Sequence, residues 1–343
     1  MLAKLCGVKV EEFGLGLPPR VWGKKIGETL YSINWIPVGG FVRMLGEDLS
    51  DNEKISDSEK TRSFSHKSKW KQALVLVAGI TFNIIFAWLV ISFCLYIGMP
   101  APVGQSSFAE TENVQTVITE VLPGSPAASS GLVSGDSIVS VAVDGKSIAN
   151  PTAEKISKAI SQSKIGDVTI VYKKGNDTKT VTITPDSNLI KGKRLIGVSM
   201  DNIGTLRLSP LPAVLEGART TYLLTISTAR GLFDFLHKTI VGKSNLAEVS
   251  GPIGIARVVG QATNLGFVYL LSLVALISIN LALINLIPFP ALDGGRLLFV
   301  LIESITRQKI PPKVAGWINT AGFILLIFLM LFISIHDIFN LLK

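Results

Sequence analysis

Three long stretches without charged side chains dominate the pattern of hydrophobic and polar positions along the chain. Residues 73–99 are nearly all apolar, and the other two stretches are residues 258–292 and 314–335. About 20 apolar residues cross a bilayer as a helix, so each stretch is long enough to span a membrane. The pattern therefore predicts membrane-spanning helices over residues 72–99, 258–292 and 314–338.

Lys and Arg residues are distributed unevenly around these stretches, and their distribution orients the helices. They cluster just before the first stretch and again between the second and third, whereas none occurs between Lys71 and Lys146. Loops rich in Lys and Arg remain on the cytoplasmic side of a membrane. Residues 1–71 and the loop at 294–313 are therefore predicted to be cytoplasmic, and residues 99–266 and the C-terminus extracytoplasmic.

The composition agrees with a membrane protein. The mean hydropathy of +0.46 is too high for an ordinary soluble enzyme. The net charge of +8 could suggest a nucleic-acid partner. The basic residues flank apolar spans, however, and no nucleic-acid-binding motif occurs, so we predict the lipid bilayer as a partner and no nucleic acid. The two cysteines, Cys6 and Cys94, form neither a metal-ligand spacing nor a disulfide framework.

Residues 113–200 have the pattern of a small α/β domain inserted between the first two spans. Strands of alternating apolar and polar residues are connected by a Gly-Ser-Pro turn, by a helix that the spacing of Ile156 and Ile160 indicates, and by a hairpin turn about Gly175. This order, with residues 124–128, 131–132 and 135–136, resembles a bacterial PDZ domain.

PDZ domains bind extended peptides by strand addition. The resemblance implies that extracytoplasmic peptide ends bind along an edge that contains Ile196, Gly197 and Val198. A spacer domain that binds no peptide is the alternative.

The segment at 211–256 begins with helical spacing of apolar residues, which predicts an amphipathic segment on the outer membrane face or, equally, a packing helix.

The sequence NLIPFPALDGG, from Asn285 to Gly295, places Asp293 at the end of the second span. A carboxylate near lipid is costly and is a functional candidate by default. Pro residues break the helix before it, and Gly294 and Gly295 are expected to let the backbone turn tightly. The carboxylate needs a cation, which a metal ion or Arg296 could supply. A surface loop with Asp293 in water is the alternative.

This segment resembles the second metal motif of the site-2 proteases, which are intramembrane zinc metalloproteases, and in particular of the regulator of sigma-E protease type. Segments at 3–19, 35–48, 78–88 and 249–256 resemble that family in the same order. The resemblance implies an α-helical integral membrane protein of the bacterial inner membrane, with one inserted extracytoplasmic α/β PDZ-like domain.

The resemblance also implies a function and roles for individual residues. Members of the family cleave the transmembrane segments of single-span membrane proteins, such as an anti-sigma factor, with Zn²⁺ as cofactor. Asp293 would be a zinc ligand, and Asn285 would lie near the substrate or the zinc site. A further set would pair as an added strand with an unwound substrate: Gly39, Gly40, Phe41 and Val42.

The His-Glu-x-x-His signature of that family does not occur in this sequence. In the signature, two His residues one helical turn apart bind zinc, and the Glu is the general base. The three histidines, His66, His237 and His336, lack this spacing. Catalytic zinc takes three protein ligands, so we expect the chain as given to lack half of the site. Residues 1–71 are expected to hold a remnant of the signature helix and a membrane-dipping β-loop.

Two other functions remain open at this point. One is a membrane-anchored adaptor that binds peptides through the PDZ-like domain without catalysis. The other is a transporter, which prolines in a membrane helix favour, although three spans and no internal repeat argue against it. Codons upstream of Met1 that encode His-Glu-x-x-His would favour the protease, and an in-frame stop codon would favour the adaptor.

Overall fold

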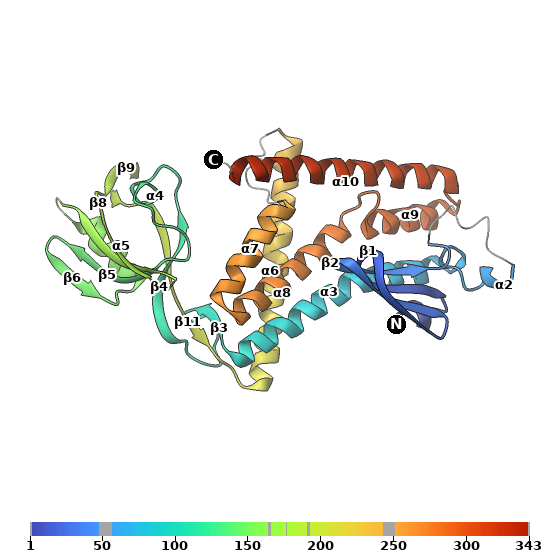
Figure 1. Ribbon diagram of the computed structural model, residues 1–343, viewed down its shortest axis with the longest axis horizontal. Helices are drawn as coiled ribbons and strands as arrows, with labels where there is room; N and C mark the ends of the chain where they lie inside the picture. Colours follow the sequence, from blue (N-terminus) through green and yellow to red (C-terminus); the bar gives the residue numbers. More distant parts are fainter. Residues whose placement is uncertain are drawn as a thin grey trace. The chain divides into compact units, whose positions relative to one another are not determined.

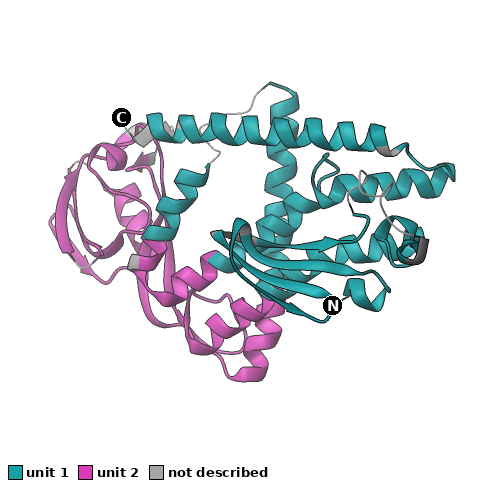
Figure 2. Cartoon of the chain, turned by 45° about the vertical axis from the view of Figure 1, so that its right-hand side comes forward, with its two compact units in different colours: residues 1–87, 221–260, 274–343 teal, residues 88–220, 261–273 magenta. Residues whose placement is uncertain are grey.

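The computed structural model describes residues 2–47, 57–163, 166–175, 177–190, 193–242 and 251–341. Figure 1 labels most of the helices and strands along the chain. Two compact units make up the structure (Figure 2): unit 1 contains residues 1–87, 221–260 and 274–343, and unit 2 contains residues 88–220 and 261–273.

The helical elements lie before, within and after the inserted α/β domain. They are α1 (Leu2–Leu5), α2 (Asp57–Lys60), the 3-10 helix η2 (Phe64–His66), α3 (Lys69–Ile97), α4 (Pro126–Ser129), α5 (Ala153–Gln162), α6 (Pro210–Ile240), α7 (Pro252–Leu265), α8 (Phe267–Leu286), α9 (Asp293–Thr306) and α10 (Pro312–Leu341).

Most strands belong to unit 2. The strands are β1 (Val10–Ile26), β2 (Thr29–Met44), β3 (Met99–Pro102), β4 (Glu112–Val121), β5 (Ser137–Val143), β6 (Lys146–Ala149), β7 (Val168–Lys174), β8 (Asp177–Ile183), β9 (Asp186–Ile190), β10 (Lys193–Leu195) and β11 (Val198–Leu206).

Among the described residues, three helices are long and apolar enough to cross a membrane: Lys69–Ile97, Phe267–Leu286 and Lys313–Phe339. The first and third lie close to the predicted spans at 72–99 and 314–338. The predicted span at 258–292 is wrong in its bounds, because the helix is interrupted at Gly266, whose φ is +120°. Residues before this break belong to α7, and the span ends at Leu286, where two prolines follow.

The predicted amphipathic segment at 211–256 also divides into separate elements. Helix α6 covers Pro210–Ile240, and α7 begins at Pro252. Residues 243–250 lie outside the described part of the chain.

The two long strands of unit 1 each pair twice. Residues 12–15 pair with 30–33 on one side and with 40–43 on the other, whereas residues 20–26 pair with 29–34. The sheet therefore has four strand segments, and 20–26 and 40–44 form its two edges.

A hydrophobic core joins this sheet to the helices of unit 1. Val10 and Met44, at the base of the sheet, share a buried cluster with Leu76 of α3 and Val300 of α9. Burial of these side chains fixes the sheet against the beginning of α3 and the middle of α9, because apolar surface removed from water stabilises their contact.

Unit 2 contains an α/β domain whose described strand pairs are all antiparallel. Its sheet has the strand order β3-β11-β4-β5-β7-β8, with β6 paired to β5. Side chains of α5, Ile156 and Ile160, are buried against strand residues such as Ile118 and Ile170. Two hydroxyl groups cap the domain's helices: Ser125 accepts the Ala128 N–H at the start of α4, and Thr152 accepts the Lys155 N–H at the start of α5.

Candidate functional site

A tight turn connects α8 to α9 and places Asp293 at the first position of α9. The N–H of Leu292 donates to the carbonyl of Phe289 at 3.2 Å, which closes the turn. Pro290 occupies its second position, and Ala291, with φ +73°, its third. A positive φ at this position is typical of a type II turn and usually requires Gly. Here an alanine adopts it, at a cost of about 1 kcal/mol.

Asn319 of α10 supports this strained turn, because its Oδ1 accepts the N–H of Ala291 at 3.3 Å. Neither Ala291 nor Asn319 was recognised in the sequence as a site residue. The Pro-Ala pair before the aspartate is a weak signal for a type II turn. The sequence contains no signal for Asn319, which comes from a different helix.

Gly294 and Gly295 lie inside α9, so the expectation that they turn the backbone is wrong. A Cβ atom on Gly294 would lie 2.3 Å from the Ile287 carbonyl oxygen, and one on Gly295 would lie 2.2 Å from the Phe289 carbonyl oxygen. Atoms cannot approach this closely. The two glycines therefore allow the chain that leaves α8 to pack directly against the first turn of α9.

The carboxylate of Asp293 faces α3. A Cβ atom built on Gly79 would lie 3.8 Å from Asp293 Oδ2. Gly79 is ten residues beyond Lys69, the first residue of α3, or about 15 Å along the helix at 1.5 Å per residue. Asp293 thus lies beside the apolar part of α3, which favours a carboxylate between membrane helices over a surface loop in water.

Among the described residues, no side chain or backbone group donates a hydrogen bond to Asp293 or forms an ion pair with it. Arg296, the alternative cation, forms an ion pair with Glu47. The half-buried side chain of Asn285 lies in the last turn of α8 and makes no hydrogen bond within the described part of the chain.

The predicted substrate strand forms an edge of the unit 1 sheet. Gly40, Phe41 and Val42 pair with residues 13–15 on one side, and no other described strand pairs with their second side. A Cβ on Gly40 would lie 3.0 Å from the Gly14 carbonyl oxygen, so the missing side chain allows close pairing.

The side chains of this edge differ in exposure. A Cβ on Gly14 would lie 2.4 Å from the Phe41 ring, so this ring covers the neighbouring segment, whereas the side chain of Val42 is 40% exposed. The backbone of Gly39 belongs to the same strand, β2.

The sheet edge and Asp293 are connected through α3 and α9. Leu76, in the core beneath the sheet, and Gly79, beside Asp293, are three residues apart on α3. This separation is about one helical turn. The base of the sheet therefore lies about one turn of α3 from the acid.

The predicted peptide edge of unit 2 lies where β11 begins. The carbonyl of Ile196 accepts the Ala127 N–H at 3.0 Å, and that of Gly197 accepts the Leu122 N–H at 2.9 Å. Residues 198–200 pair with β4, whereas β3 pairs only with residues 203–206. The second side of residues 198–200 has no strand partner among the described residues.

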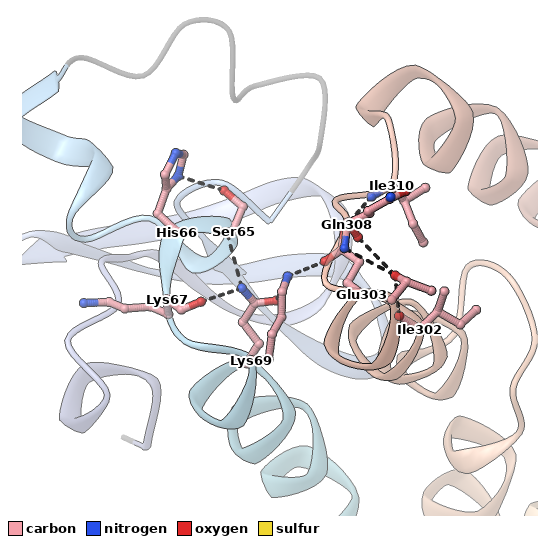
Figure 3. Close-up of polar contacts among 10 residues, drawn as sticks. Ser65, His66, Lys67, Lys69, Ile302, Glu303, Gln308 and Ile310 are labelled. Carbon is pink, nitrogen blue, oxygen red and sulfur yellow. Dashed lines mark hydrogen bonds and ion pairs between the residues drawn. The ribbon is translucent and has the colours of Figure 1, made fainter.

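His66 lies at the end of η2 and not beside Asp293. Its Nδ1 is 3.2 Å from Ser65 Oγ (Figure 3). Partial desolvation lowers the pKa of the exposed His66 imidazole, and the positive charges of Lys309 and Lys60 lower it further. His237 is exposed in the last turn of α6. In the described part of the chain, no three His, Cys, Asp or Glu side chains are grouped so that they could hold a metal ion.

Comparison with known proteins identifies the family. The model of Peptidase family M50 matches residues 1–329. A Clostridium perfringens protein that bears the name of a zinc metalloprotease is 35% identical over 339 residues, which are 98% of this chain and 92% of that protein. The regulator of sigma-W protease RasP of Bacillus subtilis is 26% identical over 413 aligned positions, which cover 98% of this chain and 93% of RasP.

The helices, the inserted domain and these similarities define a membrane metallopeptidase. The chain belongs to peptidase family M50, the site-2 proteases, whose cofactor is Zn²⁺. A zinc metalloendopeptidase activity therefore follows at the level of the family.

The described residues test how far a zinc site can be built from this chain. Asp293 has the right chemistry for a ligand, because it is a half-buried carboxylate without a hydrogen-bond donor in the described structure. Catalytic zinc takes three protein ligands. One carboxylate does not satisfy this requirement, so the described residues alone do not fit a zinc ion.

Proposed function

We propose that this protein is an intramembrane endopeptidase that cleaves the transmembrane segments of single-span membrane proteins, such as an anti-sigma factor, in the bacterial inner membrane. One observation carries the proposal beyond the family assignment. Residues 40–43 form an edge of the unit 1 sheet, with a strand partner on one side only among the described residues.

A free strand edge suits this substrate because of the backbone hydrogen bonds of a membrane helix. A transmembrane helix satisfies its N–H and C=O groups internally, so its peptide bonds are inaccessible until the helix unwinds. Unwinding leaves these groups without partners in an apolar environment, which is costly. A strand edge offers replacement hydrogen bonds to the extended segment.

Within this proposal, Asp293 contributes one ligand to the family's zinc ion, and Asn285 assists near the substrate backbone. The turn that holds Asp293 supports this role, since residues held in sparsely populated backbone conformations are concentrated at functional sites. A complete site requires at least two ligands more than the described residues supply.

The domain in unit 2 would act as an extracytoplasmic PDZ domain. The free side of residues 198–200 and the neighbouring helix α5, which share one hydrophobic core, support strand addition by a peptide end. Such binding would select substrates whose outer part has already been trimmed. The basic residues before α3 and between α9 and α10 support a cytoplasmic position for those segments.

A non-catalytic adaptor is the second candidate, because the described residues provide a single candidate zinc ligand, Asp293, together with a free strand edge in unit 2. The adaptor would bind peptide ends at residues 198–200 but would not hold an unwound transmembrane segment at residues 40–43. Contact between the substrate and the unit 1 sheet therefore distinguishes the two functions.

Cysteine cross-linking in membranes tests this contact. Val42→Cys lies on the proposed substrate edge, and Val21→Cys is a matched control, since Val21 is 59% exposed and belongs to the opposite edge segment. The native cysteines, Cys6 and Cys94, are buried and should not interfere. The protein is expressed from its own gene, including any codons before Met1, with substrates that carry single cysteines along the transmembrane segment.

Val42→Cys should form disulfides with the substrate at least about tenfold more efficiently than Val21→Cys, because pairing raises the local concentration of the thiols. Equal cross-linking from both edges, or none from Val42→Cys, would contradict strand addition and favour the adaptor.

A further inference from the structure

A cavity of about 310 Å³ lies in unit 1; Asp293 does not line it, although Asn319, which supports the turn before Asp293, does. Lys69, the first residue of α3, and Ala315, in the first turn of α10, both line it. Both helices are long and apolar enough to span a membrane. The cavity therefore lies at the level where two membrane helices begin, which corresponds to the headgroup region of a bilayer.

The acidic side chains of the cavity are already neutralised. Glu303 pairs with Lys69 and accepts the Ile310 N–H at 2.8 Å (Figure 3). Glu47 pairs with Arg296 and accepts the Met44 N–H at 3.0 Å. Each carboxylate thus has a basic partner and a backbone donor.

Lys309 supplies further positive charge at the cavity, which it lines together with His66. Lys309 is exposed and forms no ion pair with the described residues. Partial desolvation is the first cause of the lowered pKa of His66; the further lowering by Lys309 and Lys60 is consistent with a positive potential at this place.

Apolar side chains form another part of the wall. Phe64, Phe299 and Val300 contribute carbon surface beside the charged groups. A small cavity that combines positive charge with carbon surface suits an organic phosphate ester better than a simple ion, because the ester has an anionic and an apolar part.

We propose that this cavity binds the phosphate headgroup of an anionic phospholipid. Its level at the ends of two membrane helices favours a lipid over a soluble phosphate ester, and basic pockets between membrane helices are a recognised kind of headgroup site. This proposal goes beyond the proteolytic function and does not depend on it.

A headgroup in the cavity would act on the helix that begins with Asp293. Arg296 and Glu303 of α9 line the cavity, as do Lys69 of α3 and Lys309 before α10. A bound phosphate would hold α9 and the beginnings of α3 and α10 together. The lipid composition of the membrane would thereby influence the stability of unit 1.

The first test measures thermal unfolding in nanodiscs. The protein is compared in pure phosphatidylcholine and in mixtures with increasing phosphatidylglycerol. Phosphatidylglycerol should raise the Tm of the wild type. Lys309→Gln should need about fivefold more phosphatidylglycerol for the same rise in Tm, since a basic residue near an anionic surface contributes about 1 kcal/mol.

Lys71→Gln is the matched control. Lys71 is exposed and two residues from Lys69, but it does not line the cavity. Its response to phosphatidylglycerol should match that of the wild type. If both variants lose the same part of the response, general surface attraction explains it and the proposal is overturned. A wild-type Tm that does not change with phosphatidylglycerol would also overturn it.

A second readout follows His66 directly and does not depend on a pocket variant. The chain has three histidines, so replacing His237 and His336 by Gln leaves a single imidazole for NMR titration. An anion beside the imidazole favours its charged form, so short-chain phosphatidylglycerol should raise the pKa of His66. Short-chain phosphatidylcholine should not.

Inorganic phosphate serves as the comparison ligand in the same titration. The proposal expects a much smaller shift than with phosphatidylglycerol at equal concentration. An equal shift would assign the cavity to soluble phosphate and overturn the lipid assignment, and no shift with either ligand would overturn the site altogether.

Discussion

Each unit presents a strand with one side free of a described partner, but the two edges have different surroundings. In unit 1, residues 40–43 belong to a sheet whose base packs against α3 and α9; Asp293 begins α9 and lies beside α3. In unit 2, residues 198–200 belong to a sheet whose core includes α5. The first edge shares its supporting helices with the candidate metal ligand, whereas the second has a core of its own.

The difference suggests a division of labour between two similar modes of binding. A strand added at residues 40–43 would be held by the elements that position Asp293, so damage there should affect the rate of cleavage. A strand added at residues 198–200 would be held elsewhere, so damage there should affect which substrates are retained. Substitutions confined to one region can test this separation.

The largest effect is expected for Gly294→Ala, in the turn before α9. The added Cβ would lie 2.3 Å from the Ile287 carbonyl oxygen and 2.5 Å from that of Leu286. Backbone must move to accommodate it, and a displacement of about 1 Å in a catalytic site can reduce the rate about 100-fold. Cleavage of a reconstituted substrate should fall by about this factor, while peptide binding by unit 2 remains unchanged.

Gly316→Ala is the control for this substitution. Gly316 lies in α10 with no atom within 4 Å of an added Cβ, so Ala should preserve activity. If Gly294→Ala cleaves the substrate as fast as Gly316→Ala does, the tight turn does not position the reacting groups.

A smaller effect is expected for Gly197→Ala, at the edge of unit 2. Its Cβ would lie 2.3 Å from the Ser125 Cβ, which would displace the beginning of β11. Peptide ends should bind about tenfold more weakly by fluorescence anisotropy, as expected from an overpacking cost of 1–3 kcal/mol. Cleavage of a substrate without an extracytoplasmic peptide end should continue at the wild-type rate.

Gly131→Ala separates the clash from backbone strain. Gly131 has φ +84° and Gly197 has φ +80°, but no atom lies within 4 Å of a Cβ on Gly131. Both variants therefore carry the strain of a positive φ, and only Gly197→Ala adds the contact with Ser125. If Gly197→Ala leaves peptide binding intact but slows cleavage of the short substrate, the proposed division between the units is wrong.

The membrane spans were largely predictable because a helix across lipid requires a continuous apolar run. That rule located α3 and α10 within a few residues. It failed at 258–292, where two helices and a turn share one uncharged stretch. Hydropathy carries no information on the positive φ of Gly266, and proline marks the end of α8 only approximately.

The chemistry around Asp293 was predictable only in part. The aspartate and its prolines drew attention to the turn. The sequence did not show that position 294 requires glycine because the carbonyl oxygen of Ile287, just beyond the end of α8, would lie too close to a Cβ atom. Asn319 bonds to the turn, and Gly79 lies beside the Asp293 carboxylate, each from another helix. The sequence likewise did not show that Arg296 pairs with Glu47, because such contacts depend on how distant segments pack.

The most direct test of the account is the zinc content of the purified protein, expressed from its own gene with any codons that precede Met1. Wild type should retain one zinc ion per chain after dialysis, and Asp293→Asn should bind zinc more than about 100-fold more weakly, since even residues that only orient a ligand contribute 10- to 100-fold. Equal zinc retention by Asp293→Asn, at unchanged folding, would contradict the claim that Asp293 is a metal ligand.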